Sequence, residues 1–420
     1  MSRSYRICID ARFTPGYSGG VENVVAGLVY GLSSLEDRLE KYYILAYEES
    51  AAWLSQYMKG PWDVLACKRP ANIMLKRAIS THFPNVKALL ERIGSIEPKA
   101  FTSIPRSPEI VEKAKIDLMH FALQSAFLTN CRSIYHPHDL QHVHLPEYFS
   151  RYERIGRSLK YKAFCGAADL VAVSSSWVKD DVADNFGISR SKIAVVPLAP
   201  ATELVDISLT PSECISVQQQ FRLPDEFAFY PAQTWPHKNH LALVNAIAVA
   251  RDRYGIKVPL VLAGRQGSSF ASIHRRIDQL GLADHVHSLG FVSARQLQAL
   301  YKLCKIVVIP SKFEAASFPL WEAFLAGAPA ACSNVTSLPR QANGAALVFG
   351  ADDVDSMAQC ICRLWTDDRL RQELAEKGAA VVSQFTWKRT ALAFRGHYRN
   401  ILGLPLLTEE QQLLDATPII

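Results

Sequence analysis

The chain has 420 residues, 49% of them hydrophobic and 20% charged, and a formal net charge of +6. This composition excludes a disordered or fibrous protein, and the length predicts two domains rather than a single core. No apolar run reaches the ~18 residues of a membrane span, the first ten residues lack the apolar stretch of a signal peptide, and nine scattered cysteines provide no disulfide framework. We therefore expect a two-domain cytoplasmic protein.

The first half of the chain alternates short apolar runs with amphipathic segments, a pattern that predicts parallel strands joined by helices. We expect strands at 5–10, 42–47, 117–121, 132–135, 169–176 and 192–199, and helices at 21–35, 151–168 and 177–188. Between the first strand and the first helix lies Gly19-Gly20, where the missing Cβ atoms allow an anion to approach the backbone N–H groups. A plain turn is the alternative for this glycine pair.

Residues 50–115 are harder to interpret. They carry scattered basic side chains among Leu, Ile and Phe, with helix-like spacing at 72–83 and 85–93. One interpretation is solvated helix faces; the other is a basic amphipathic surface that lies on a bilayer. Residues 1–200 hold 25 Lys and Arg against 20 Asp and Glu, an excess too diffuse to favour nucleic acid.

A histidine-rich segment, HPHDLQHVHLPEYF, follows the expected strand at 132–135. Its spacings match no common zinc pattern, and no cysteine or carboxylate completes a ligand set, so we expect no metal site. A His-Asp pair just beyond a strand end suits polar contacts to a substrate. We expect His138 to hydrogen-bond a sugar hydroxyl and Asp139 to orient its ring.

The second half repeats the alternation after a weakly periodic stretch at 200–225, which we interpret as a linker. We expect strands at 227–232, 258–264, 306–309 and 328–332, and helices at 240–255, 271–280, 294–304, 319–326, 355–365, 369–385 and 387–402. The predicted domains are 1–205, 206–385, and a C-terminal segment, 386–420, whose helix packs back towards the first domain.

The stretch 306–333 organises the second domain. Its apolar run is followed by a polar loop holding Glu314, and Phe318-Pro319 then starts a helix that ends at Gly327. The free N–H groups of a helix start favour an anion, while the carboxylates of Glu314 and Glu322 on either side suit hydroxyl groups. The alternative is a βαβ unit in which Glu314 is a solvated loop residue and Glu322 only complements the helix dipole.

Together these segments resemble the retaining glycosyltransferases of family 4, which have the GT-B fold of two facing Rossmann-like domains with parallel sheets and an interdomain cleft. Four motifs carry the resemblance: GYSGGVEN, the His-Asp segment, YPAQTWPHKNH with Lys238, and Glu314-x7-Glu322. The chain departs from the family where Ala315 and Ser317 replace common glycines and where Gln233 replaces a common arginine.

The resemblance implies roles for individual residues in binding a nucleotide-diphosphate sugar. Lys238, Gly19, Gly20 and the helix start at Ser317-Phe318 stabilise the departing diphosphate. Arg265 is either a further phosphate contact or a solvent-facing side chain. The alternatives are an exposed loop lysine for Lys238 and a structural histidine for His138. Glu322 accepts hydrogen bonds from the ribose, Glu314 from the sugar, and the backbone at Gly290-Phe291 holds the base. The candidate catalytic residues are Glu314, Lys238 and His138, and His138 with Asp139 forms the acceptor side; no metal or cofactor is implied.

The implied reaction is retaining transfer of a hexose to a saccharide or lipid-linked acceptor in surface polysaccharide synthesis, with peripheral attachment to the inner face of the membrane. Mannose from GDP-mannose is the preferred donor, because the loop holding Lys238 resembles those of bacterial polysaccharide mannosyltransferases. UDP-linked glucose, galactose or N-acetylglucosamine stay open. A catalytically silent scaffold subunit and a nucleotide-sugar epimerase are the alternative functions.

Overall fold

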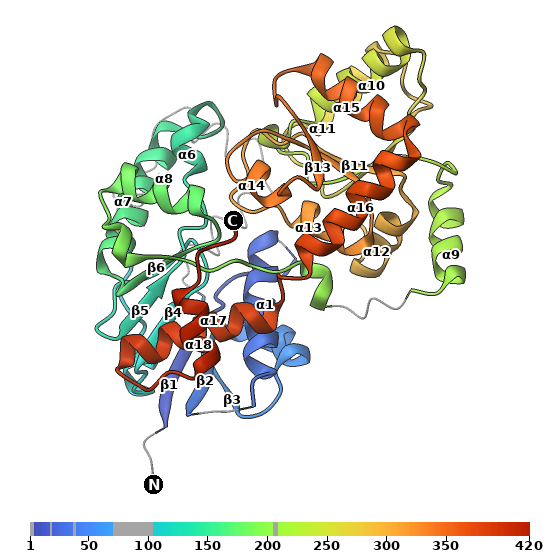
Figure 1. The fold of residues 1–420 in the computed structure, drawn as a ribbon. Helices are drawn as coiled ribbons and strands as arrows, with labels where there is room; N and C mark the ends of the chain where they lie inside the picture. The colour runs from blue at the N-terminus through green and yellow to red at the C-terminus, as the bar shows by residue number, and fades with distance from the viewer. Residues whose placement is uncertain (1–3, 17–18, 37–38, 70–103, 205–208) are drawn as a thin grey trace. The chain divides into compact units, whose positions relative to one another are not determined.

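The computed structural model describes residues 4–16, 19–36, 39–69, 104–204 and 209–420 (Figure 1). The chain divides into two compact units. Unit 1 contains Met1–Val173, Lys179–Val196 and Lys388–Thr417, and unit 2 contains Ser174–Val178, Pro197–Trp387 and Pro418–Ile420. The last long helices of the chain therefore belong to the unit that begins it.

Unit 1 is built on a seven-stranded sheet in which every strand pair is parallel. Its strand order is β3-β2-β1-β4-β5-β6-β7. The strands are β1 (Tyr5–Asp10), β2 (Glu40–Tyr47), β3 (Trp62–Cys67), β4 (Leu118–Phe121), β5 (Arg132–Tyr135), β6 (Leu170–Val173) and β7 (Ile193–Val195). Because the order reverses between β1 and β4, the loops that follow these strands flank the point where ligands bind in such sheets.

Helices connect and cover these strands, as parallel pairing requires. The α-helices are α1 (Gly20–Ser33), α5 (Glu109–Lys113), α6 (Gln141–His144), α7 (Arg151–Ala167), α8 (Ser176–Phe186), α17 (Trp387–Leu402) and α18 (Thr408–Asp415). The 3-10 helices are η1 (Glu48–Tyr57), η2 (Pro146–Tyr148) and η3 (Arg190–Lys192). A capping box between Ser150 and Glu153 starts α7.

Unit 2 has a six-stranded parallel sheet with the order β10-β9-β8-β11-β12-β13. The strands are β8 (Ala228–Pro231), β9 (Leu260–Ala263), β10 (Val286–Ser288), β11 (Ile306–Ile309), β12 (Ala330–Ser333) and β13 (Ala346–Phe349). All four residues of β11 are fully buried, as expected for a strand with helices on both faces. The strand order reverses between β8 and β11.

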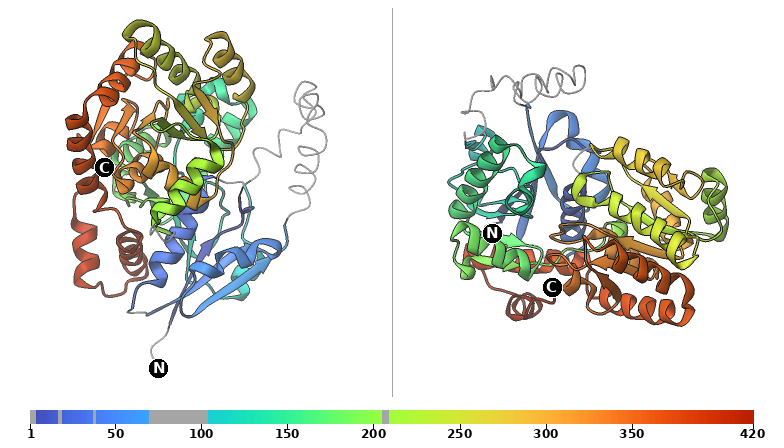
Figure 2. Two further views of the ribbon diagram at one scale, coloured as in Figure 1. Left: turned by 90° about the vertical axis from the view of Figure 1, so that its right-hand side faces the viewer. Right: turned by 90° about the horizontal axis from the view of Figure 1, so that it is seen from above.

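Two layers of helices cover this second sheet (Figure 2). One layer contains α10 (His240–Tyr254), α11 (Phe270–Gln279) and α15 (Val354–Thr366). The other contains α9 (Pro211–Phe221), α12 (Ala294–Leu303), α13 (Phe318–Ala326) and α16 (Asp368–Val382). Shorter helices are η4 (Ala201–Leu204), η5 (Pro236–Lys238) and α14 (Leu338–Ala342).

The predicted α/β class with two parallel Rossmann-like sheets is confirmed. The stretch 200–225, interpreted as a linker, contains the helix α9, which is started by a capping box between Thr210 and Glu213 and by Pro211 at the first helical position. The helix-like segments at 72–83 and 85–93, and most of the basic surface proposed for 50–115, lie outside the described residues.

Candidate active site

The reversal of strand order in unit 2 brings together two loops that are far apart in sequence. Lys238 ends the short helix after β8, and Glu314 lies in the loop after β11; these strands are neighbours in the sheet. The Lys238 ammonium lies 2.6 Å from Oε1 of Glu314. Both predicted residues therefore meet at the carboxyl edge of the sheet, where parallel sheets bind ligands.

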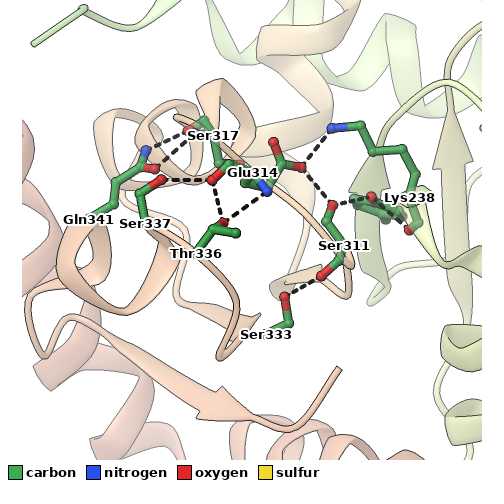
Figure 3. A network of polar contacts seen from close by, with 9 residues as sticks. Lys238, Ser311, Glu314, Ser317, Ser333, Thr336, Ser337 and Gln341 are labelled. Carbon is green, nitrogen blue, oxygen red and sulfur yellow. Dashed lines mark hydrogen bonds and ion pairs between the residues drawn. The ribbon is translucent and has the colours of Figure 1, made fainter. Parts of the chain in front are cut away.

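The Glu314 carboxylate receives a second hydrogen bond from within the protein. Ser311 Oγ donates to the same Oε1 atom at 2.6 Å (Figure 3). The Tyr230 hydroxyl lies 3.1 Å from Ser311 Oγ and donates to the carbonyl oxygen of Lys238 at 3.0 Å. Ser311 and Tyr230 are both buried, so this contact fixes the carboxylate and the lysine loop to each other.

Asn239 anchors the loop that carries Lys238. Its backbone is left-handed, with φ 58°, a conformation that asparagine tolerates better than most residues. Its side-chain amide donates to the carbonyl oxygens of Pro310 at 3.0 Å and Ala351 at 2.8 Å. The Lys238 loop is thereby tied to the end of β11, from which the Glu314 loop departs.

The backbone of the Glu314 loop is held from its other side by hydroxyl groups. Thr336 Oγ1 accepts from the N–H of Glu314 at 3.1 Å and donates to its carbonyl oxygen at 2.5 Å. Ser337 Oγ lies 2.7 Å from the carbonyl oxygen of Glu314 (Figure 3). It also lies 2.5 Å from the carbonyl oxygen of Ala315. These hydrogen bonds therefore hold the backbone of the loop in place at Glu314 and Ala315.

Ser317 is clamped at the start of α13 by Gln341. Gln341 Oε1 accepts from the Ser317 N–H at 2.8 Å, and its Nε2 donates to the Ser317 carbonyl oxygen at 2.7 Å. Ser317 has φ −96°, so the serine is unstrained. Its N–H is occupied, Pro319 has none, and the Trp321 N–H donates to the Ser317 carbonyl oxygen at 3.4 Å, so the amides of Phe318 and Leu320 are those that suit an anion at this helix start. The Ser317 hydroxyl is buried and forms no hydrogen bond among the described residues.

Glu322 lies in α13 with its carboxylate turned into the core. The Tyr301 hydroxyl donates to Oε2 of Glu322 at 2.8 Å and also approaches the carbonyl oxygen of Pro319 at 3.3 Å. Burial raises the pKa of Glu322 to about 7, while the hydrogen bond from Tyr301 opposes the shift. Near pH 7 the protonated and the ionised forms of the Glu322 carboxyl group are therefore present in comparable amounts.

The positive charge of the loop after β8 belongs to Lys238. Burial, with a smaller contribution from the charge of Lys238, lowers the pKa of His237 to about 3 and that of His240 to about 4. Both imidazoles are consequently neutral at pH 7. Chemically, the loop offers one ammonium group beside one carboxylate.

An exposed aromatic side chain follows β10, the edge strand of the sheet in unit 2. Phe291, with 66% of its surface exposed, follows β10, and the Arg265 guanidinium lies 4.5 Å from its ring centroid. Gly290 has φ 70°, and its carbonyl oxygen accepts from the N–H of Gly264 at 2.7 Å. A Cβ at Gly264 would lie 2.3 Å from the Ala232 carbonyl oxygen, so this loop packs directly against the segment leading to Lys238.

In unit 1, the glycine pair lies where the sequence predicts, between β1 and α1. Gly19 is the N-cap of α1 with φ 61°, a conformation that favours glycine, and Gly20 is its first residue. Upstream, Arg12 binds Asp10 with two hydrogen bonds of 2.8 Å, so the end of β1 is fixed by an ion pair whose carboxylate is buried.

His138 follows β5 and has a left-handed backbone with φ 61°. Its Nε2 lies 2.9 Å from the carbonyl oxygen of Ala122. Because a carbonyl oxygen only accepts, Nε2 carries the proton and Nδ1 is an acceptor. Burial lowers the pKa of His138, which keeps the ring neutral. Asp139 Oδ1 accepts from the N–H of Gln141, and its role in orienting His138 stays a prediction.

The sequence did not predict a buried histidine pair beside this loop. His120 Nε2 lies 2.7 Å from His136 Nε2, and His120 Nδ1 lies 2.5 Å from the Tyr398 hydroxyl on α17. Burial lowers the pKa of His120 to about 3 and that of His136 well below its usual value. His136 could have been found, since it lies in the histidine-rich segment; Tyr398, 278 residues from His120, could not.

Lys238 and Glu314 are thus in contact, and Ser317 lies three residues along the same loop of unit 2, whereas Gly19, Gly20, His138 and Asp139 belong to unit 1. Within the described ranges, no group of three or more His, Cys, Asp and Glu side chains is arranged to hold a metal ion. In that same part of the chain, no helix is both long and apolar enough to cross a membrane.

Two family descriptions match successive parts of the chain. Residues 18–203 match "Glycosyltransferase Family 4", and residues 212–381 match "Glycosyl transferases group 1". The second range contains β8–β13 with Lys238, Glu314 and Glu322, and the first contains the glycine pair and the His-Asp segment.

Curated relatives are similar over part of their length. The chain is 28% identical over 254 residues to O-antigen chain mannosyltransferase B of Escherichia coli, covering 60% of this chain and 66% of that protein. It is 30% identical over 235 residues to the serotype-specific mannosyltransferase WbdA of Escherichia coli, covering 55% of this chain and 29% of the relative. The chain thus spans less than two thirds of either relative.

Solved structures share the fold at low identity. HepE of Anabaena, in complex with UDP and glucose, superposes with a TM-score of 0.69 at 19% identity, covering 94% of this chain and 100% of that one. WaaG, a glycosyltransferase involved in lipopolysaccharide biosynthesis, has a TM-score of 0.65 at 12% identity, with coverage of 94% and 100%.

Proposed function

Because the chain belongs to the glycosyltransferases of the GT-B fold, with a family 4 domain followed by a group 1 domain, we propose that it is a retaining hexosyltransferase. The donor is a nucleotide-diphosphate sugar, with mannose from GDP-mannose preferred. The acceptor is a saccharide or a lipid-linked saccharide, and the reaction belongs to surface polysaccharide synthesis on the cytoplasmic side of a membrane.

The observation that carries this proposal is the meeting of Lys238 and Glu314 at the reversal of strand order, beside the start of α13. An ammonium and helix-start amides suit a diphosphate, and a carboxylate suits sugar hydroxyls. The two side chains are far apart in sequence and buried for the most part, so a solvated surface ion pair does not account for them.

Different residues of unit 2 bind different parts of the nucleotide-diphosphate sugar. When the bond between the sugar and the diphosphate breaks, negative charge grows on the phosphate oxygens, and Lys238 with the amides of Phe318 and Leu320 stabilises it. Glu314 accepts hydrogen bonds from sugar hydroxyls, and Glu322 turns from Tyr301 to accept from the ribose. The backbone at Gly290-Phe291 holds the base, and Arg265, stacked on Phe291, adds a phosphate contact.

The glycine pair and the His-Asp segment of unit 1 supply further contacts. Amides at Gly19 and Gly20 are donors that suit phosphate oxygens, and Nδ1 of neutral His138 accepts a hydrogen bond from a substrate hydroxyl. In a retaining transfer on one face of the sugar, the departing phosphate oxygen takes the proton of the acceptor hydroxyl. We therefore assign no protein base.

The choice of mannose is supported by relatives whose names describe mannosyltransferases, at 28% and 30% identity. A thermal-shift series with GDP-, UDP-, ADP- and dTDP-linked sugars tests the donor, since a ligand at 100 times its Kd stabilises the folded state by about 2.7 kcal/mol. We expect GDP-mannose to give the largest shift. A larger shift with a UDP-sugar would overturn the donor assignment while leaving the transferase assignment intact.

The catalytic assignment is tested by Glu314→Ala, which should abolish transfer while nucleotide binding stays measurable. Glu226→Ala is the matched control, because Glu226 also pairs with a lysine in unit 2 but has 58% of its side chain exposed. Unchanged turnover in the Glu314 variant would contradict the proposal. Two results with the original protein would identify the alternative functions. Isomerisation of the donor without acceptor would identify an epimerase, and absence of any turnover of the nucleotide sugars would identify a silent scaffold.

A further inference from the structure

His138, the residue of unit 1 proposed to contact substrate, has a backbone conformation that few side chains adopt. Its φ is 61°, and the N–H of Asp139 donates to the carbonyl oxygen of Pro137 at 2.8 Å. This hydrogen bond closes a γ-turn around His138, and the form of γ-turn with a positive φ at its central residue is rare and strained. Such a conformation persists only where the surrounding structure fixes it, so the neighbours of His138 must hold the turn.

The residue just before the turn, His136, belongs to a network of three buried side chains, which we call the His-Tyr network: His136, His120 and Tyr398. Nε2 of His136 lies 2.7 Å from Nε2 of His120, and Nδ1 of His120 lies 2.5 Å from the Tyr398 hydroxyl. His136 is 4% exposed, and the other two side chains are 0% exposed. Only Pro137, whose ring fixes its φ, separates His136 from His138, so a displacement of His136 reaches the turn directly.

Both ring nitrogens of His120 have a partner. Burial lowers the pKa of His120 to about 3, so the ring is neutral and carries one N–H. If Nε2 carries the proton, it donates to His136 and Nδ1 accepts from the Tyr398 hydroxyl. If Nδ1 carries it, Nδ1 donates to the Tyr398 oxygen and Nε2 accepts from His136. His120 is thus satisfied in either arrangement, and a satisfied buried polar network rigidifies the groups that it joins.

The sheet and α17 of unit 1 place the network. The N–H of His136 donates to the carbonyl oxygen of Phe121 at 3.0 Å, which fixes the backbone of His136 against β4. Phe394 of α17 packs on both imidazoles, with ring centroids 4.7 Å from His120 and 5.2 Å from His136. Apolar side chains would fill this space without the cost of burying three polar groups. The polar groups are therefore explained by the direction that they impose on His136, which packing alone does not supply.

We propose that His120 and Tyr398 are positioning residues: they fix His136, and through it the strained turn, so that Nδ1 of His138 faces a substrate hydroxyl. The inference rests on the proposed function for the identity of the group that His138 contacts. The position of the turn, in contrast, is a property of unit 1 alone, because all of these residues belong to it. It can therefore be measured without turnover.

The first test is hydrogen–deuterium exchange of the full chain, measured by mass spectrometry on peptides that cover residues 136–144. Tyr398→Phe removes only the terminal hydroxyl of the network, so we expect exchange in this segment to become about 2- to 10-fold faster, with exchange in β1 and β2 unchanged. Ser33→Ala is the matched control. Ser33 is buried in α1 and accepts from the indole N–H of Trp62 at 2.9 Å, but it does not belong to the network. This variant should leave exchange at 136–144 unchanged.

Two substitutions of His120 separate positioning from packing. The side-chain amide of glutamine reaches the place of Nε2, and that of asparagine reaches the place of Nδ1. His120→Gln therefore keeps the contact with His136, whereas His120→Asn keeps only the contact with Tyr398. Both leave part of the space of the ring unfilled, so both should lower the melting temperature. We expect kcat for transfer to be about tenfold lower in the asparagine variant than in the glutamine variant, with the Kd of the free nucleoside diphosphate unchanged in both.

Three results would overturn the proposal. They are unchanged exchange at 136–144 in Tyr398→Phe, exchange that rises equally throughout unit 1 in that variant, and equal kcat in the two His120 variants. A failure of the proposed function gives a different result. The original protein would then turn over no nucleotide sugar, while exchange at 136–144 would still respond to Tyr398→Phe and not to Ser33→Ala.

Discussion

Two side chains donate hydrogen bonds to the Glu314 carboxylate, and the proposed function requires only one of them to move when the nucleotide sugar binds. Lys238 and Ser311 both contact Oε1, but the proposed function requires Lys238 to turn towards the diphosphate. Ser311, buried and fixed in the loop after β11, has no such second task. It is therefore a positioning residue that keeps the carboxylate in place during transfer.

Ser311→Ala should lower kcat/KM about 10- to 100-fold, because a hydrogen bond to a charged group contributes about 1.5–3 kcal/mol. Steady-state kinetics with saturating acceptor measures it. Ser333→Ala is the control: Ser333 Oγ donates to the Ser311 carbonyl oxygen at 2.5 Å and does not contact the carboxylate. If both variants lose activity equally, Ser311 has only a general structural role.

Glu322 makes stability depend on pH. Its pKa is about 7 in the folded protein, against 4.5 ordinarily, because burial disfavours the charged form. The unfolded carboxyl group loses its proton first as pH rises. The free energy of unfolding should therefore fall between about pH 4.5 and pH 7, by about 3 kcal/mol in all, and be level above that range.

Glu322→Gln should remove this part of the pH dependence. Relative to the original protein, the variant should gain stability at pH 8 compared with pH 5, as measured by urea unfolding at both values. Parallel curves for the two proteins would show that the Glu322 carboxyl group does not titrate in this window.

At the level of elements, the position of α13 depends on the absence of a side chain on α16. A Cβ at Gly378 would lie 2.7 Å from a ring carbon of Phe324, so α16 approaches α13 across bare backbone. Since α13 also carries the N-cap Ser317 and Glu322, this packing fixes the helix start that faces the proposed diphosphate site.

Gly378→Ala should destabilise the protein by about 1–3 kcal/mol, because the clash with Phe324 outweighs the better helix propensity of alanine. Gly166→Ala in α7 is the matched substitution: nothing lies within 4 Å of its added Cβ. Alanine there should stabilise by up to about 1 kcal/mol. Thermal melts should shift in opposite directions, and shifts of the same sign would contradict the packing argument.

Across the whole molecule, buried charges join the end of the chain to its beginning. Arg399 on α17 contacts Glu40 at the start of β2 at 2.7 Å and Glu410 on α18 at 3.1 Å. Arg395 contacts Glu410 at 2.5 Å. All four side chains are nearly inaccessible to water, and 359 residues separate Arg399 from Glu40.

Glu410→Ala should cost about 3–5 kcal/mol, because it removes the carboxylate that two buried guanidinium groups contact. Arg190→Ala is the comparison, since Arg190 pairs with Asp180 and Asp184 on the surface, where ion pairs contribute little. Urea unfolding should show a large loss for the first variant and almost none for the second. Equal losses would mean that the buried cluster contributes no more than surface charge.

Periodicity in the sequence was sufficient to predict most strands and helices of both sheets. It was sufficient even for β11 and α13, because a short β-branched run and a Phe-Pro start are local signals. The missed helix α9 had a readable signal in Thr210 and Glu213. The partners of the site residues could not be read, since the pairing of Glu314 with Ser311 and Thr336, or of Ser317 with Gln341, depends on how loops after different strands meet.

The membership of α17 and α18 in unit 1 has a consequence for biosynthesis. A ribosome releases residues in order, so unit 2 has most of its sheet and helices before Tyr398 and Glu410 emerge. The first unit cannot complete its core during this time, because the surfaces around His120 and Glu40 that contact α17 are still uncovered. The half that is translated first is thus expected to complete its core only after most of the second half has been made.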